Sequence, residues 1–108
     1  MANSAIGIDV GATNIKAGLV SSEGQVLKEL RRETRAGDGV EAVVSTICEV
    51  SNELSRAAQV SCIGVGAPGL VDPHTGTVRV PPNLPGWEEV PVKDLLQARV
   101  ETPVIVAN

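Results

Sequence analysis

The chain opens with short apolar runs separated by turn sequences. Apolar residues predominate in 5–10 and 14–21, and Gly11 lies in the turn between the two segments. A second turn, Ser21-Ser22-Glu23-Gly24, leads into 25–34, which begins apolar and then becomes charged. Because the connections between these three segments are short, the pattern predicts three strands in an antiparallel meander.

Apolar residues then recur at helical spacing as far as residue 58. They are Val40, Val43, Val44, Ile47, Cys48, Val50, Leu54 and Ala58. The pattern predicts a helix that Asp38 caps, with Glu41 three residues later in the capping-box position. Val60 to Gly66 then reads as a buried strand.

Proline marks a change in the second half of the chain. All seven prolines lie between Pro68 and Pro103, so we expect an elaborated loop region over 68–91. Residues 77–80 are expected to form a hairpin arm, Pro91 to start a short helix that runs through Arg99, and 102–107 to form a last buried strand. The predicted class is α/β, with a mixed sheet, helices and a small hairpin.

Composition narrows the classes of function. The chain has 108 residues, 43% hydrophobic and 20% charged, which suits one globular domain. A net charge of −4 and a single aromatic residue, Trp87, argue against a nucleic-acid surface. No apolar run approaches the ~20 residues of a membrane span, and no signal-type segment opens the chain. Cys48 and Cys62 are expected to be free thiols, and the expected location is cytoplasmic.

The first turn carries the most suggestive chemistry. Asp9 and Thr13 flank Gly11, and Lys16 follows on the return strand. A carboxylate, a hydroxyl, exposed backbone N–H groups and an ammonium would suit a metal-bound phosphate. The same residues also suit an ordinary hairpin bend, in which Asp9 accepts hydrogen bonds from turn amides.

Two later loops are candidates for close approach by a ligand. Residues 64–69 match the GxGxxG spacing, but proline and glycine stand where a dinucleotide site needs a helix, so a nicotinamide site is not expected. These glycines suit close approach by a ligand or a plain strand exit. The stiff loop 81–87 either presents Asn83 to a hydroxyl-rich ligand or is a proline-braced loop with Trp87 in the core. With one histidine and no Cys/His cluster, no zinc ligands are expected.

Together, four segments resemble the ROK family of sugar kinases, especially its bacterial glucokinase-like members. The segments are Ile8-Asp9-Val10-Gly11-Ala12-Thr13-Asn14-Ile15-Lys16, Gly64-Val65-Gly66-Ala67-Pro68-Gly69, Pro82-Asn83-Leu84-Pro85-Gly86-Trp87 and Pro103-Val104-Ile105-Val106-Ala107-Asn108. They occur in the family's order and span nearly the whole chain. The resemblance implies a ribonuclease H-like (actin/hexokinase-type) fold, with a five-stranded mixed sheet and a cleft between two lobes.

The resemblance also implies the residues of the site. ATP phosphates and Mg²⁺ would lie at Asp9, Gly11, Ala12, Thr13, Asn14 and Lys16, with Asp9 facing Mg²⁺ through water. The sugar would contact Gly69 through its backbone, together with Asn83 and Asn108. Gly11-Ala12 departs from the two adjacent glycines of many relatives. Leu70 replaces the polar or basic residue of some N-acylmannosamine-type relatives, which favours glucose.

Residues 1–108 are accordingly interpreted as the N-terminal lobe of a hexose kinase that phosphorylates the 6-hydroxyl of glucose. In the family the asparagine that matches Asn108 is followed by the general-base aspartate, so the lobe alone is expected to be inactive. Alternatives are an N-acetylhexosamine kinase, the sugar-sensing domain of a ROK-type repressor, and a free-standing binding domain. Met1–Ser4 would leave no room for a repressor's winged helix-turn-helix. Apolar surface left open by the missing lobe predicts a homo-oligomer.

Overall fold

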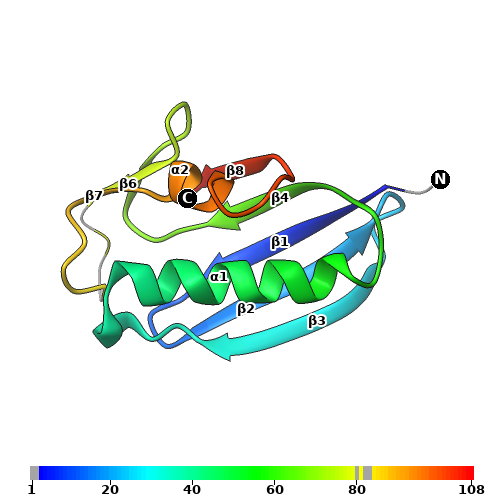
Figure 1. The fold of residues 1–108 in the computed structure, drawn as a ribbon, viewed down its shortest axis with the longest axis horizontal. Helices are drawn as coiled ribbons and strands as arrows, with labels where there is room; N and C mark the ends of the chain where they lie inside the picture. Colours follow the sequence, from blue (N-terminus) through cyan, green and yellow to red (C-terminus); the bar gives the residue numbers. More distant parts are fainter. Residues whose placement is uncertain (1–2, 80, 82–83) are drawn as a thin grey trace.

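In the computed structural model, which describes residues 3–79, 81 and 84–108, five strands form one sheet in the order β3-β2-β1-β4-β8. Their bounds are Ser4–Val10 (β1), Asn14–Ser21 (β2), Val26–Glu33 (β3), Val60–Gly66 (β4) and Val104–Ala107 (β8). Strands β1, β2 and β3 pair antiparallel, whereas β4 is parallel to both β1 and β8. The predicted meander and mixed sheet are confirmed (Figure 1).

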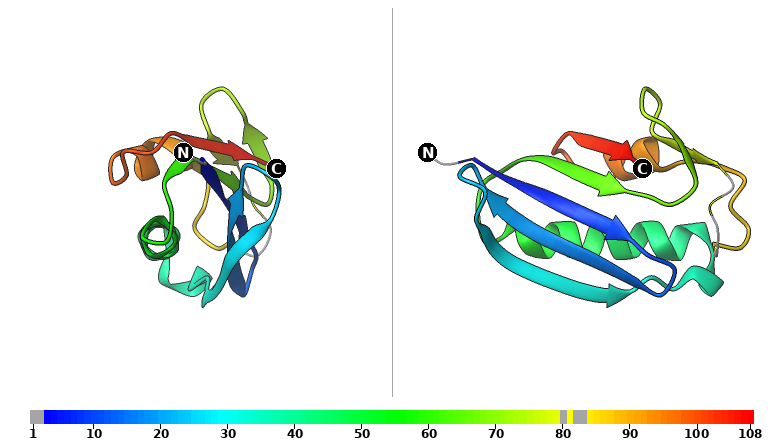
Figure 2. Two further views of the ribbon diagram at one scale, coloured as in Figure 1. Left: turned by 90° about the vertical axis from the view of Figure 1, so that its right-hand side faces the viewer. Right: turned by 180° about the vertical axis from the view of Figure 1, so that it is seen from behind.

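One face of this sheet is buried under the helix α1, Val40–Ser55. Alternate residues of β1 point toward the helix, and Ile6, Ile8 and Val10 are buried there. Val44 and Ile47 are among the helix residues that close this core. Figure 2 shows α1 on one side of β1, β2 and β3, and no described element covers the other side of these strands.

The expected cap of α1 is wrong. Asp38 ends a short 3₁₀ turn, Ala36–Asp38, and its Oδ2 lies 3.2 Å from Arg35 Nε. The helix begins at Val40 after Gly39, and no side chain caps it. Gly39 has φ 95°, so the chain turns sharply at a residue that tolerates the left-handed region, and Asp38 stands one position too early. The helix also ends at Ser55, before the expected residue 58.

The proline-rich half forms a second, smaller sheet of strands β5 (Leu70–Asp72), β6 (Thr77–Arg79) and β7 (Glu89–Pro91). The hairpin β5–β6 was expected, but β7 was not. Asp72 Oδ1 accepts a hydrogen bond of 2.9 Å from the His74 N–H, which fixes the turn and lowers the pKa of the Asp72 carboxyl. The helix α2, Val92–Gln97, follows Pro91 as predicted, although it ends before Arg99.

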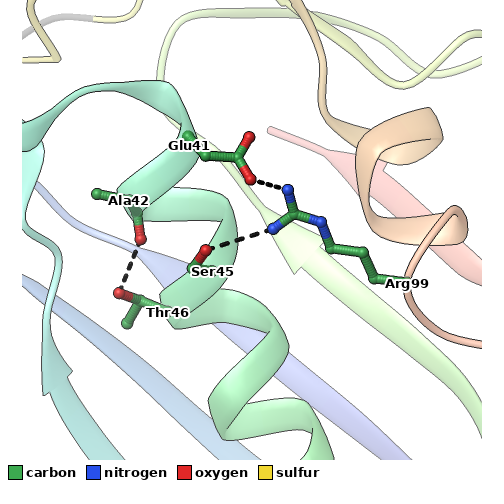
Figure 3. A network of polar contacts seen from close by, with 5 residues as sticks. All are labelled: Glu41, Ala42, Ser45, Thr46 and Arg99. Atoms are coloured by element: carbon green, nitrogen blue, oxygen red, sulfur yellow. Dashed lines mark hydrogen bonds and ion pairs between the residues drawn. The ribbon is translucent and has the colours of Figure 1, made fainter.

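Arg99 connects the end of α2 to the first turn of α1 (Figure 3). Its guanidinium pairs with Glu41 and also donates to Ser45 Oγ at 3.4 Å. Both partners lie near the surface, where such a pair is worth about 0.2–1 kcal/mol. Apolar contact of α2 with the core, chiefly through buried Val92 and Leu96, holds this helix more strongly than the ion pair does.

Among the described residues, no helix is long and apolar enough to cross a membrane. Both cysteines are free, as expected; Cys48 is buried in α1, and Cys62 in β4 is half-buried. Burial, and to a smaller extent the charge of Glu49, raises the pKa of the Cys48 thiol.

Alkylation of the two cysteines checks this packing. A raised pKa lowers the thiolate fraction of Cys48 at pH 8, and burial blocks access, so iodoacetamide should modify Cys48 at least about tenfold more slowly than Cys62. Peptide mass spectrometry on a time course measures both rates in the same sample. Equal rates at the two sites would show that α1 does not pack as described.

Candidate functional site

One row of residues crosses the main sheet near the carboxyl ends of its parallel strands. Asp9 in β1 pairs with Gly66 in β4, and Gly66 pairs with Ala107 in β8. On the other side, Asp9 pairs with Lys16 in β2. The arrowheads of β1, β4 and β8 point the same way (Figure 1). The loops that leave these strands therefore meet at one edge, where open α/β sheets bind ligands.

The first of these loops is the tight turn between β1 and β2. The Gly11 N–H donates to the Asn14 carbonyl at 3.0 Å, and a Cβ on Gly11 would lie only 2.8 Å from that oxygen. Glycine is needed here because of this close approach, since Gly11 is not among the residues with positive φ. Asp9, Ala12 and Thr13 are all exposed, so the carboxylate and the hydroxyl are open to a ligand.

Thr34, which the sequence analysis missed, holds this turn from behind. It follows β3 and is fully buried. Its Oγ1 donates to the Gly11 carbonyl at 2.7 Å, and its N–H donates to the Thr13 carbonyl at 2.8 Å. The only signal in the sequence is one uncharged residue within the charged segment that ends the third strand.

Lys16 is exposed on the open face of the sheet, beside Asp9 and Arg31 in the neighbouring strands. It forms no ion pair with any described residue. The three side chains line a hollow of about 570 Å³, whose floor includes Gly7, Gly18 and Gly64. Lys16 therefore stands on the sheet face next to the first turn, not within the turn itself.

The loop that leaves β4 lies against Asn108, the residue that follows β8. The side-chain amide of Asn108, which follows β8, donates to the carbonyls of Gly69 at 2.5 Å and Ala67 at 3.3 Å. Gly69 has φ 87°, and a Cβ there would meet Arg79 O and Pro81 Cα at 2.7 Å. Two candidate sugar-binding residues, Gly69 and Asn108, are thus brought together by direct contact.

The remaining loop candidates have different outcomes. Asn83 lies outside the described residues. Trp87 is only 6% exposed and belongs to the core, as the alternative interpretation of its loop held. Its indole Nε1 has no hydrogen-bond partner among the described residues. The glycines of 64–69 lead into strand β5 and not into a helix, which agrees with the rejection of a nicotinamide site.

The sheet order, the first turn and the contact of Asn108 with the loop after β4 define a lobe of the ribonuclease H-like, actin/hexokinase-type α/β class. The chain belongs to the ROK family, whose family model matches residues 5–108. It is 39% identical over 103 residues to a glucokinase of Thermotoga maritima, covering 95% of this chain and 32% of that protein. Most of the chain is therefore comparable, but it spans about a third of the length of the curated relatives it matches.

A solved structure supports the same assignment. The ROK family glucokinase of Streptomyces griseus, in complex with glucose and AMPPNP, superposes with a TM-score of 0.89 at 37% identity. That comparison covers 98% of this chain and 33% of the other. The family also contains regulators: a xylose repressor of Caldicellulosiruptor bescii is 30% identical over 110 residues, covering 97% of this chain and 27% of the repressor.

Substitution of Gly69 tests the close approach of the loops. Gly69→Ala should cost about 1–2 kcal/mol for the left-handed backbone alone and more for the contacts with Arg79 and Pro81. Gly24→Ala is the matched control, because Gly24 has φ 85° but an added Cβ would meet no atom within 4 Å. Urea denaturation measures both. A loss at Gly69 no larger than that at Gly24 would contradict the packing described for the loop.

Proposed function

We propose that this chain forms the N-terminal lobe of an ATP-dependent hexose kinase that transfers the γ-phosphoryl group to the 6-hydroxyl of glucose. One observation carries the proposal: the exposed Asp9 and Thr13 of the first turn share an edge of the sheet with Asn108 and Gly69. ATP bound at the turn and a sugar bound at the other loops would then be neighbours, as transfer of a phosphoryl group between them requires.

The first turn suits the phosphates of ATP. The backbone N–H groups of 11–14 and the Thr13 hydroxyl are donors for phosphate oxygens, and Lys16 supplies positive charge beside them. Family resemblance assigns the same positions, Asp9, Gly11, Ala12, Thr13, Asn14 and Lys16. The similarity to a glucokinase described with AMPPNP supports a nucleotide ligand.

The residues also fit Mg²⁺, provided that it arrives with the nucleotide. No group of three or more His, Cys, Asp or Glu side chains gathers to hold a metal within 3–79, 81 and 84–108. Mg²⁺ commonly keeps several waters and uses one or two carboxylates together with substrate phosphates. Asp9 would be that carboxylate, through water, and the bound ion would neutralise charge on the transferring phosphoryl group.

The hexose would lie against the loops after β4, β6 and β8. We assign it to the backbone of Gly69 and the side chains of Asn83 and Asn108. The Asn108 amide nitrogen is already bound to the loop, which leaves its Oδ1 to accept a hydrogen bond from a sugar hydroxyl. Glucose is the preferred hexose because of Leu70 and the similarity to glucokinases; an N-acetylhexosamine is the alternative substrate.

The similarity to a xylose repressor supports a second candidate, the sugar-sensing domain of a transcriptional regulator. Such a domain would need the loops to which we assign the hexose, but it would not need a turn that binds phosphate. Binding of Mg²⁺·ATP therefore discriminates between the two functions. In either case we propose a cytoplasmic protein that completes its cleft with a second lobe. We expect the 108-residue chain alone to self-associate through surface left open without that lobe.

Removal of one carboxylate tests the phosphate site. Asp9→Asn should weaken binding of Mg²⁺·ATP to the 108-residue chain by about tenfold, because the substitution removes the only carboxylate assigned to the ion. Titrations followed by amide NMR suit the weak affinity expected of phosphate contacts alone. Asp94→Asn, an exposed change on α2, is the charge-matched control. Equal weakening by both variants would contradict the assignment of Asp9.

Catalysis by the lobe alone is tested separately. We assign phosphate and sugar contacts to this chain, the general base to the aspartate that the family resemblance places directly after the position of Asn108, and the second wall of the cleft to the other lobe. A coupled assay of glucose phosphorylation with the 108-residue chain should therefore stay at background. Clear turnover by this chain would contradict the division of the site between two lobes.

A further inference from the structure

Thr34 contacts the first turn in a way that determines where the turn's N–H groups point. Its hydroxyl binds the Gly11 carbonyl at 2.7 Å, and its backbone N–H binds the Thr13 carbonyl at 2.8 Å. Residues 11 and 34 are separated by 23 positions, so the two bonds tie the end of β3 to the far end of the β1–β2 hairpin. Thr34 itself is fully buried.

Because peptide units are planar, these two contacts also fix the direction of the N–H groups of Ala12 and Asn14. Within a trans peptide unit the C=O and the following N–H point to opposite sides, and no cis peptide bond occurs among the described residues. The Gly11 carbonyl shares its unit with the Ala12 N–H, and the Thr13 carbonyl shares its unit with the Asn14 N–H. Because both carbonyls point at buried Thr34, both N–H groups point away from it.

The Ala12 N–H is available to a ligand. Ala12 is exposed, and its N–H donates to no described residue. An N–H group that is held in direction without an internal partner is prepared to bind an anion without reorganisation. The Asp9 carboxylate lies nearby, so such an anion would need a cation beside it, as a magnesium-bound phosphate has.

We propose that Thr34 is a positioning residue, which aims the Ala12 N–H group out of the first turn as a donor for a phosphate oxygen. This inference rests on the proposed function, since it names a backbone donor of the same phosphate site. The hydroxyl is the part of Thr34 that a side-chain substitution can remove, and the backbone bond to Thr13 is retained in every variant below.

The test compares three variants of the 108-residue chain. Thr34→Val removes the hydroxyl with little change of shape, and Thr34→Ser restores it. Thr46→Val is the matched control, because Thr46 is also buried and its Oγ1 donates to a backbone carbonyl, that of Ala42 at 3.0 Å (Figure 3), far from the turn. Thermal unfolding is recorded for all three, so that a general loss of stability is separated from a local effect.

Two measurements follow by amide NMR: backbone order parameters of 11–14 without ligand, and the dissociation constant for Mg²⁺·ATP. Thr34→Val should lower the order parameters of the turn and weaken binding by about tenfold. Thr34→Ser should bind within twofold of the unaltered chain, and Thr46→Val should change neither quantity. Unaltered binding by Thr34→Val, or equal weakening by Thr46→Val, overturns the inference.

Failure of the proposed function gives a different result. If the unaltered chain does not bind Mg²⁺·ATP, the phosphate site is refuted, and the order parameters alone decide whether Thr34 fixes the turn. An equally ordered turn in Thr34→Val then overturns the inference as well. A turn that loosens in Thr34→Val and not in Thr46→Val supports the positioning role of the hydroxyl.

Discussion

Parallel pairing of β1, β4 and β8 in one register is the constraint on which the candidate site depends. It sets Asp9, Gly66 and Ala107 side by side. Each residue lies near the end of its strand, so three loops that are distant in sequence leave the sheet at one edge. A slip of one residue in any of these strands would turn its buried apolar residues away from the core, and burial therefore protects the register.

The electrostatics of this row explain why a phosphate would need a cation here. Asp9 in β1 pairs with Lys16 in β2, and Lys16 pairs with Arg31 in β3. Two positive charges therefore lie beside one negative charge. An anion placed at the first turn gains from the cations and from the amides, but it meets the Asp9 carboxylate at close range. A divalent ion between carboxylate and phosphate converts this repulsion into attraction, whereas an anion without a cation would bind less favourably.

Local patterns were sufficient to predict the five strands of the main sheet and both helices, because most of these elements bury an apolar face or run. They failed where the structure depends on the backbone conformation of a single residue or on contacts with distant residues. Asp38 has the sequence of a cap, but Gly39 with its positive φ intervenes before the helix. The short strand β7 is defined by its pairing with β6, which no local pattern reveals. Thr34 acts through residues 23 positions away, and no local spacing reveals such a contact. Asp9 and Gly11 could be recognised from the sequence because the turn glycine and the side chains suited to a metal-bound phosphate lie in one continuous segment.

The central claim is that the turn between β1 and β2 receives the phosphates of a metal-bound nucleotide. Replacement of Mg²⁺ by Mn²⁺ in the complex with ATP tests it most directly, because the paramagnetic ion broadens the amide signals nearest to it. The account predicts the strongest broadening at residues 9–14, with weaker effects at 66–69. Broadening centred on another part of the chain, such as the turn at Asp72, or spread evenly over the surface, would contradict it.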